Sequence, residues 1–175
     1  MLRTMPLVLQ TAAAHCAAPA ILVLDTNIWL DLLVFHDPRV AWLGTALEAG
    51  RLRAMIDAFG LAELTRVLAY PLGRFAIAPG ERAGILDACR CLAFEFTAVP
   101  GTSMPPLPRC RDRHDQPFLE LARACGARCL ITKDRDLLML ARRLRAIAAF
   151  VIVTPADAHR LLALQVETDA VARNG

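Results

Sequence analysis

The sequence predicts an α/β fold, a single domain with a central parallel sheet of about five strands and helices on both faces. Short apolar runs such as Ile21–Asp25 and Arg128–Thr132 alternate with longer segments of helical periodicity. Consecutive parallel strands need a crossover connection, usually a helix, and a parallel sheet needs cover on both faces. The predicted helices between the strands provide both the crossover connections and the cover of the sheet.

The predicted elements follow one another with short connections. The strands share short apolar or β-branched runs and are expected at Ile21–Asp25, Arg51–Asp57, Phe94–Val99, Arg128–Thr132 and Ala149–Val153. The helices share apolar positions three or four residues apart and are expected at Pro38–Ala49, Gly60–Tyr70, Pro79–Cys91, Asp115–Cys125, Arg135–Leu144 and Pro155–Leu164. Pro100–Pro108, with four prolines and a glycine, is expected to be a loop.

Length and composition limit the domain organisation. A chain of 175 residues suits one domain, and its 56% hydrophobic and 21% charged residues exclude a disordered protein. We assign residues 20–165 to the domain, 1–19 to an N-terminal extension and 166–175 to a polar tail. The uncharged stretch Met5–Leu24 leaves a signal peptide or a membrane span as alternatives to an extension, and Met5 is an alternative start. Prolines and polar residues interrupt the stretch, so we expect no membrane association.

Charge and cysteine content exclude other classes. The net charge of +3 does not indicate a strongly basic coat, so binding of nucleic acid would depend on local clusters. Six cysteines occur without a CxxC pair or zinc-finger spacing. We interpret them as reduced, mostly buried thiols of a cytoplasmic protein, with pairing across the fold as the alternative.

Four acids are predicted to gather at one edge of the sheet. Asp25 ends the first strand, Asp134 follows the fourth, Asp115 opens a helix after the proline loop, and Glu63 lies in the first turn of its helix. Ligands of open parallel sheets bind outside the carboxyl ends of the strands. Crowded carboxylates repel one another, and an oxygen-only set of ligands favours Mg²⁺ or Mn²⁺.

Each acid also has a purely structural interpretation. Asp25 and Asp115 could cap helices, while Asp134 and Asp136 could be first-turn acids favoured by the helix dipole. Glu63 by itself would more often be an exposed helix residue. For Asp25 the functional interpretation is stronger, since a carboxylate that ends a buried apolar strand is costly without a purpose.

Four segments resemble one family in order and spacing. They are Ile21–Ile28, which contains Asp-Thr-Asn, then Ala62–Leu68, Arg111–Ala122 and Leu130–Leu138. Together they resemble the PIN-domain family, and within it the VapC-like ribonucleases that are toxins of bacterial toxin–antitoxin systems. The resemblance extends from about Ile21 to Leu162. It implies a parallel-sheet fold, one or two Mg²⁺ or Mn²⁺ ions, and hydrolysis of phosphodiester bonds, usually in RNA.

The resemblance also implies roles for individual residues. By position, the catalytic and metal-binding acids are Asp25, Glu63, Asp115 and Asp134, with Asp136 and Asp112 as auxiliary acids and Asn27 and Thr132 as supporting polar residues. Lys133 departs from the family, which often has a small residue there. Its ammonium could crowd the metals or contact a phosphate.

Basic residues flank the expected acidic edge. We expect RNA contacts from Arg111, Arg113, Lys133 and Arg135, together with Arg109, although alternating Arg and Asp could equally balance charge on a solvated loop. His114 is adjacent to Asp115, but we interpret it as a solvated loop residue and not as a general base.

Two other functions remain open at the level of sequence. One is a Mg²⁺-dependent phosphohydrolase of small esters, against which Asn27 stands where a phospho-aspartate mechanism uses a second Asp. The other is a non-catalytic PIN-like binding module. The resemblance further implies a homodimer and an antitoxin partner.

Overall fold

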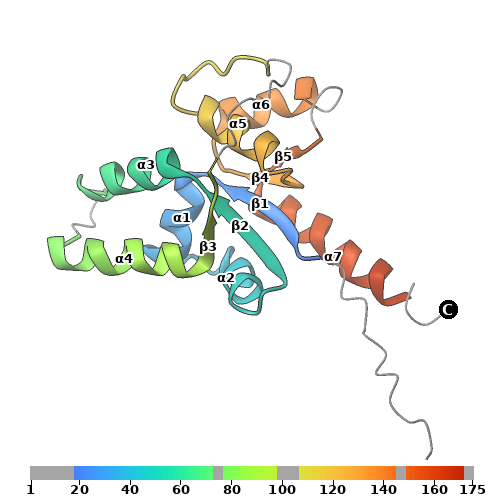
Figure 1. Ribbon diagram of the computed structural model, residues 1–175, viewed down its shortest axis with the longest axis horizontal. Helices are drawn as coiled ribbons and strands as arrows, with labels where there is room; N and C mark the ends of the chain where they lie inside the picture. Colours follow the sequence, from blue (N-terminus) through green and yellow to red (C-terminus); the bar gives the residue numbers. More distant parts are fainter. Residues whose placement is uncertain (1–17, 73–76, 98–106, 145–148, 172–175) are drawn as a thin grey trace, which may run out of the picture.

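Five parallel strands form the centre of the molecule. The computed structural model describes residues 18–72, 77–97, 107–144 and 149–171, with side chains up to residue 163 (Figure 1). The strand order is β3-β2-β1-β4-β5. The strands are β1 (Ala20–Leu24), β2 (Leu52–Ile56), β3 (Ala93–Glu95), β4 (Cys129–Ile131) and β5 (Val151–Val153). The predicted parallel sheet is thus confirmed, with β1 central between β2 and β4.

Helices cover both faces of this sheet. They are α1 (Thr26–Leu33), α2 (Ala41–Glu48), α3 (Ala58–Leu68), α4 (Pro79–Leu92), α5 (Gln116–Ala124), α6 (Arg135–Leu144) and α7 (Pro155–Val171). Side chains alternate along a strand, so Leu22 and Leu24 of β1 pack with α1, α2, α3, α4 and α7, whereas Val23 packs with α5 and α6. The two apolar clusters hold the sheet between two layers of helices (Figure 1).

Helix α1 was not predicted from the sequence. Its run Thr26–Leu33 is short and mostly apolar, so periodicity does not separate it from a strand continuation. In the structure Ile28 and Trp29 are buried against the sheet, because the chain must turn back over the face that Leu22 and Leu24 line.

Two elements have boundaries that differ from the predicted ones. Helix α3 begins at Ala58, two residues before the predicted start, because the Asp57 carboxylate accepts a hydrogen bond from the Gly60 amide at 2.8 Å. Glu63 therefore lies in the second turn of the helix, not the first. Strand β3 begins at Ala93, one residue before the predicted start, and ends at Glu95, short of the predicted Val99.

The last helix is longer than predicted. Helix α7 continues to Val171, past the expected end at Leu164 and into the segment expected to be a polar tail. Residues 1–17 of the N-terminal extension, residues 98–106 of the proline loop region and residues 172–175 lie outside the described residues. Within the described part of the chain, no helix is long and apolar enough to cross a membrane.

The cysteines within the described residues carry free thiols. Cys89 and Cys129 are buried, and burial raises the pKa of each to about 12. Cys91 is exposed, in contrast to the buried thiols expected from the sequence. Protonated, buried thiols are poor nucleophiles and poor metal ligands, so Cys89 and Cys129 are core residues. Cys16 lies outside the described residues.

Candidate active site

Asp25 lies at the carboxyl end of the central strand. It is the residue before α1, and only 6% of it is exposed. Its backbone amide donates to Ile131 of β4, which places Asp25 level with Thr132 on the neighbouring strand. The buried polar side chains of the described residues are all at or near this edge of the sheet, namely Asp25, Thr26, Asp31 and Thr132.

Two side chains fix the Asp25 carboxylate. The Thr132 hydroxyl and the Asn27 amide nitrogen each donate to Asp25 Oδ2 at 2.5 Å. Asn27 also donates to Thr132 Oγ1 at 3.3 Å, so the three side chains close a small network. Asp25 therefore directs its carboxylate to these side chains, which differs from the structural interpretation of a simple helix cap. The network places Asn27 and Thr132 in contact with Asp25, and their supporting role stays a prediction.

Asp134 is joined to the same network through the backbone. Its amide donates to Thr132 Oγ1 at 2.8 Å. Its Oδ1 accepts hydrogen bonds from the amides of Asp136 at 2.7 Å and Leu137 at 3.1 Å, so Asp134 caps α6. One carboxylate oxygen thus serves the helix, and the second is available for other contacts. The capping and site interpretations of Asp134 are compatible.

The pKa of Asp115 departs further from its ordinary value than the pKa of Asp25 does. Burial raises the pKa of Asp115 to about 6, and the charges of Asp134, Asp25, Asp112 and Asp136 add to the rise. Burial also raises the pKa of Asp25, with a further contribution from Asp134 that hydrogen bonds from Thr132 and Asn27 oppose. Asp25, Asp115 and Asp134 therefore form one interacting group, which we call the acid cluster.

Glu63 lies apart from the acid cluster. Arg66, one turn along α3, donates to its two carboxylate oxygens at 2.9 and 2.7 Å, and this pair lowers the pKa of Glu63. The more distant charges acting on Glu63 are those of His114 and Asp112. The structure thus places Glu63 beside the loop that precedes α5.

A shallow open depression borders the acid cluster. It is lined by the loop before α5 and the first turn of α6, through Arg111, Asp112, Arg113, His114 and Asp136. The side chains expected to contact RNA are exposed, namely Arg109, Arg111, Arg113, Lys133 and Arg135. Asp112 Oδ1 accepts from the His114 amide at 2.8 Å, so this auxiliary acid also orders the loop.

Sequence reasoning missed one residue at this edge. Asp31 of α1 is buried, and its carboxylate binds the Lys133 ammonium, with Oδ1 accepting a hydrogen bond at 2.6 Å. The ammonium expected to reach phosphate or metals is thus held by a carboxylate. A lone acid inside the apolar run Ile28–Val34 was the available signal.

The acid cluster has the chemistry of a hard-cation site. Its donors are carboxylate oxygens, and burial together with mutual repulsion raises the pKa of Asp25 and of Asp115. Within the described residues, no three carboxylate, imidazole or thiol side chains converge as ligands of one ion in their present rotamers. The cluster residues fit a divalent cation by charge and ligand type. Glu63, outside the cluster, would have to leave Arg66 to join them.

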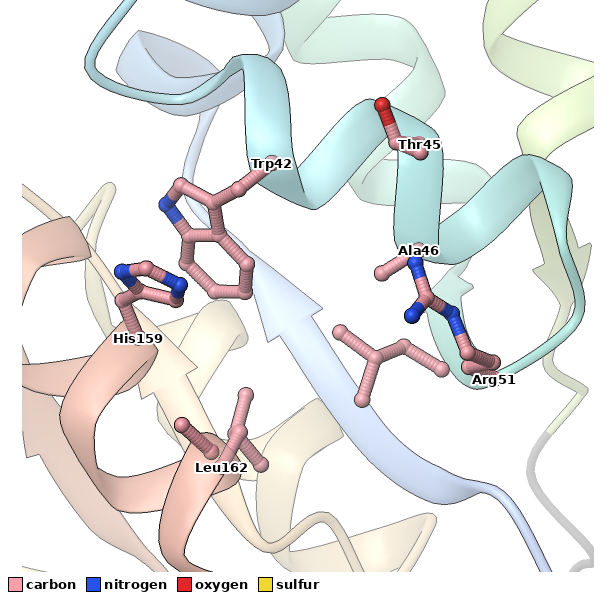
Figure 2. Close-up of a pocket in the computed structure, with 8 residues that line it drawn as sticks. Trp42, Thr45, Ala46, Arg51, His159 and Leu162 are labelled. Atoms are coloured by element: carbon pink, nitrogen blue, oxygen red, sulfur yellow. The ribbon is translucent and has the colours of Figure 1, made fainter. Parts of the chain in front are cut away.

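A second cavity, more enclosed than the depression beside the acid cluster, lies elsewhere. Figure 2 shows a cavity of about 500 Å³ where Trp42 of α2 faces His159 of α7, with the two rings stacked 4.7 Å apart. Arg51 and Leu52 line its floor near the amino end of β2, whereas the acid cluster lies at the carboxyl ends of the strands. Carboxylates are absent from the described residues that line this cavity, which excludes it as the metal site.

The fold and the acid cluster define an α/β protein with interacting carboxylates, of which Asp25 is buried, at the carboxyl edge of a parallel sheet. A family profile described as the PIN domain matches residues 21–136, and the chain belongs to this family. Among solved structures, it is similar to a chain of VapBC2 from Rickettsia felis, bound in that crystal to a DNA fragment from the promoter. The TM-score is 0.50 at 16% identity, over 77% of this chain and 98% of the other. No curated protein matches this chain.

Proposed function

We propose that this PIN-domain protein is a metal-dependent ribonuclease that hydrolyses phosphodiester bonds. The observation that supports it most is the electrostatic coupling of Asp25, Asp115 and Asp134. A fold gains nothing from three repelling carboxylates in one place unless a cation or a proton relieves them. RNA as the substrate class rests on the family resemblance and on the exposed basic residues beside the cluster.

In this proposal Asp25, Asp115 and Asp134 hold Mg²⁺ or Mn²⁺, with Glu63 and Asp136 contributing directly or through water. Such an ion supplies a water of lowered pKa and neutralises charge on the phosphate. Thr132 and Asn27 hold the Asp25 carboxylate in one orientation, so less conformational entropy is lost when a ligand binds.

The chain's basic side chains would position the substrate. Arg111 and Arg113 face the depression that Asp136 borders, and Arg135 opens α6 beside Asp134. Guanidinium groups suit bidentate contact with phosphate oxygens, so these residues would hold a phosphodiester over the acids. Phosphate contacts carry no sequence information directly, so this surface would bind many RNAs.

The geometry also weighs against a phosphomonoesterase that uses a phospho-aspartate. Such a mechanism needs an acid two residues after the nucleophile to protonate the leaving group. Here that residue is Asn27, whose amide nitrogen is bound to Asp25 and Thr132 and whose oxygen accepts from the Lys133 amide at 3.2 Å. An amide has no proton to exchange in this role.

The test is cleavage of end-labelled single-stranded RNA by purified protein with Mn²⁺ or Mg²⁺. We expect cutting that EDTA stops and that Asp25→Asn abolishes. A matched control is Asp57→Asn, since Asp57 ends the neighbouring strand β2 and caps α3 outside the acid cluster. Cutting by Asp25→Asn at the rate of the unmodified protein would remove the site, and equal loss in Asp57→Asn would make the effect non-specific.

We further propose that the protein is a homodimeric, cytoplasmic toxin that a cognate antitoxin neutralises. The similarity to a chain of a VapBC complex supports this role. Induced expression should then arrest bacterial growth, and Asp25→Asn should not. Co-expression of a short DNA-binding protein encoded immediately upstream should restore growth, whereas arrest that persists with Asp25→Asn would contradict a toxin acting through these acids.

A further inference from the structure

An ion pair between the buried Asp31 and the exposed Lys133 lies beside the acid cluster. The Asp31 side chain on α1 is 4% exposed, and that of Lys133 is 42% exposed. One Asp31 oxygen accepts a hydrogen bond from Lys133 Nζ at 2.6 Å, and the other lies 2.5 Å from the same nitrogen. The pair spans 102 residues of sequence and joins α1 to the connection between β4 and α6.

The backbone of Lys133 belongs to the candidate site. Its neighbours in the chain are Thr132 and Asp134, and its amide donates to Asn27 Oδ1. Lysine carries a compact charge on a flexible four-carbon stem. An ammonium attached at this point would be drawn to the nearest carboxylates, and Asp134 of the acid cluster is the next residue along the chain.

Asp31 binds the Lys133 ammonium on the side of α1. It lies six residues after Asp25, which corresponds to about 9 Å along the helix axis at an α-helical rise. The partly buried Asp37, in the connection after α1, lies on the same side, since Arg39 and, to a smaller extent, Lys133 lower the pKa of its carboxyl. The Lys133 charge is therefore held over the carboxyl-terminal end of α1 and away from the cluster.

We propose that Asp31 is a positioning residue that withdraws the Lys133 ammonium from Asp25 and Asp134 and so leaves their negative charge available to a divalent cation. The inference rests on the proposed function only in taking the acid cluster as a cation site. Stability alone gives a weak account of the pair, since an ion pair with one exposed partner contributes little net free energy of folding. An ammonium among the carboxylates would instead act as a competing cation.

The test is Mn²⁺ affinity, measured by calorimetric titration of the metal-free protein, without RNA. Asp31→Asn frees the ammonium while keeping the side-chain shape, and we expect the dissociation constant for Mn²⁺ to rise about tenfold. Adding Lys133→Met removes the competitor, so Asp31→Asn/Lys133→Met should bind Mn²⁺ within about threefold of the unmodified protein. A purely structural role for Asp31 would not be rescued by deleting Lys133.

Controls separate charge from folding. Asp37→Asn removes a nearby, partly buried acid that is paired with Arg39, and it should leave Mn²⁺ affinity unchanged. If Asp31→Asn does not fold, Asp31→Leu is used in its place, because leucine is a good helix former and fills the buried site. The expected results are the same. Unchanged affinity in the single variant, or a double variant as weak as the single one, would overturn the proposal.

The titration also distinguishes this inference from the proposed function. An unmodified protein that binds Mn²⁺ but leaves RNA intact contradicts the ribonuclease assignment alone. An unmodified protein that does not bind Mn²⁺ overturns both.

Discussion

The hydroxyl of Thr132 donates a hydrogen bond of 2.5 Å to the carboxylate of Asp25, across 107 residues of sequence. Both residues directly follow neighbouring parallel strands, and neither side chain is more than 6% exposed. This single contact ties the ends of β1 and β4 together. Since Thr132 Oγ1 also accepts from the Asp134 amide, it sets the spacing of two members of the acid cluster.

Removal of the Thr132 hydroxyl should therefore destabilise the folded protein. Thr132→Val preserves the shape but leaves a buried carboxylate without one of its donors, and we expect the free energy of unfolding to fall by about 1.5–3 kcal/mol. Thr132→Ser keeps the hydroxyl and should lose less. Urea denaturation of the two variants measures the difference, and equal stability of Thr132→Val and the unmodified protein would show that the contact contributes nothing.

Neutralising Asp115 should stabilise the metal-free protein at neutral pH. Its pKa is about 6 in the folded state against an ordinary 3.8, so the folded protein holds this proton more tightly than the unfolded chain. The ionised carboxylate thus destabilises the fold progressively as pH rises from 3.8 to 6, and fully above that.

Asp115→Asn should therefore raise the free energy of unfolding at pH 7.5 by roughly 1 kcal/mol, a modest figure because solvent screens a half-exposed carboxylate. The gain should shrink as pH falls below 6 and vanish below 3.8. Denaturation curves in EDTA at pH 7.5 and pH 5 measure it. A variant less stable than the unmodified protein at pH 7.5 would contradict the assigned repulsion.

The Arg66–Glu63 pair should compete with a metal for Glu63. Arg66→Gln frees the carboxylate, and we expect Mn²⁺ to bind about threefold more tightly, since an ion pair of this exposure is worth under about 1 kcal/mol. Arg90→Gln is the matched control, because Arg90 forms the same i,i+3 pair with Asp87 on α4. If both variants bind Mn²⁺ like the unmodified protein, Glu63 takes no part in the metal site.

Arg111 and Arg113 should contribute to RNA affinity through phosphate contacts. We expect Arg111→Gln/Arg113→Gln, placed in the Asp25→Asn background to prevent cleavage, to weaken binding of single-stranded RNA. The slope of log affinity against log salt should fall by about 1.4, or 0.7 per lost contact. Fluorescence anisotropy measures both, with Arg142→Gln/Arg143→Gln on the exposed face of α6 as the control. Equal losses in the two pairs would indicate a diffuse charge effect.

The sequence predicts the centre of this fold well, for physical reasons. Asp25 and Thr132 each end a short apolar run, and the carboxyl ends of parallel strands share an edge, so their proximity follows from the pattern. The pairing of Glu63 with Arg66 was also readable, as an i,i+3 pair on one helix.

Other features depend on tertiary packing. Helix α1 forms because its apolar run covers the sheet, and an eight-residue apolar run is ambiguous by periodicity. The Asp31–Lys133 pair joins residues 102 apart, and the direction of a lysine side chain is set by what surrounds it. The sequence thus located Lys133 at the site but not the carboxylate that holds it.

The most direct test of the central claim is the anomalous scattering of manganese in crystals grown with Mn²⁺. The account predicts a strong anomalous peak between the carboxylates of Asp25, Asp115 and Asp134. Crystals saturated with Mn²⁺ that show no peak at this position, or a peak only at a site remote from Asp25, would contradict it.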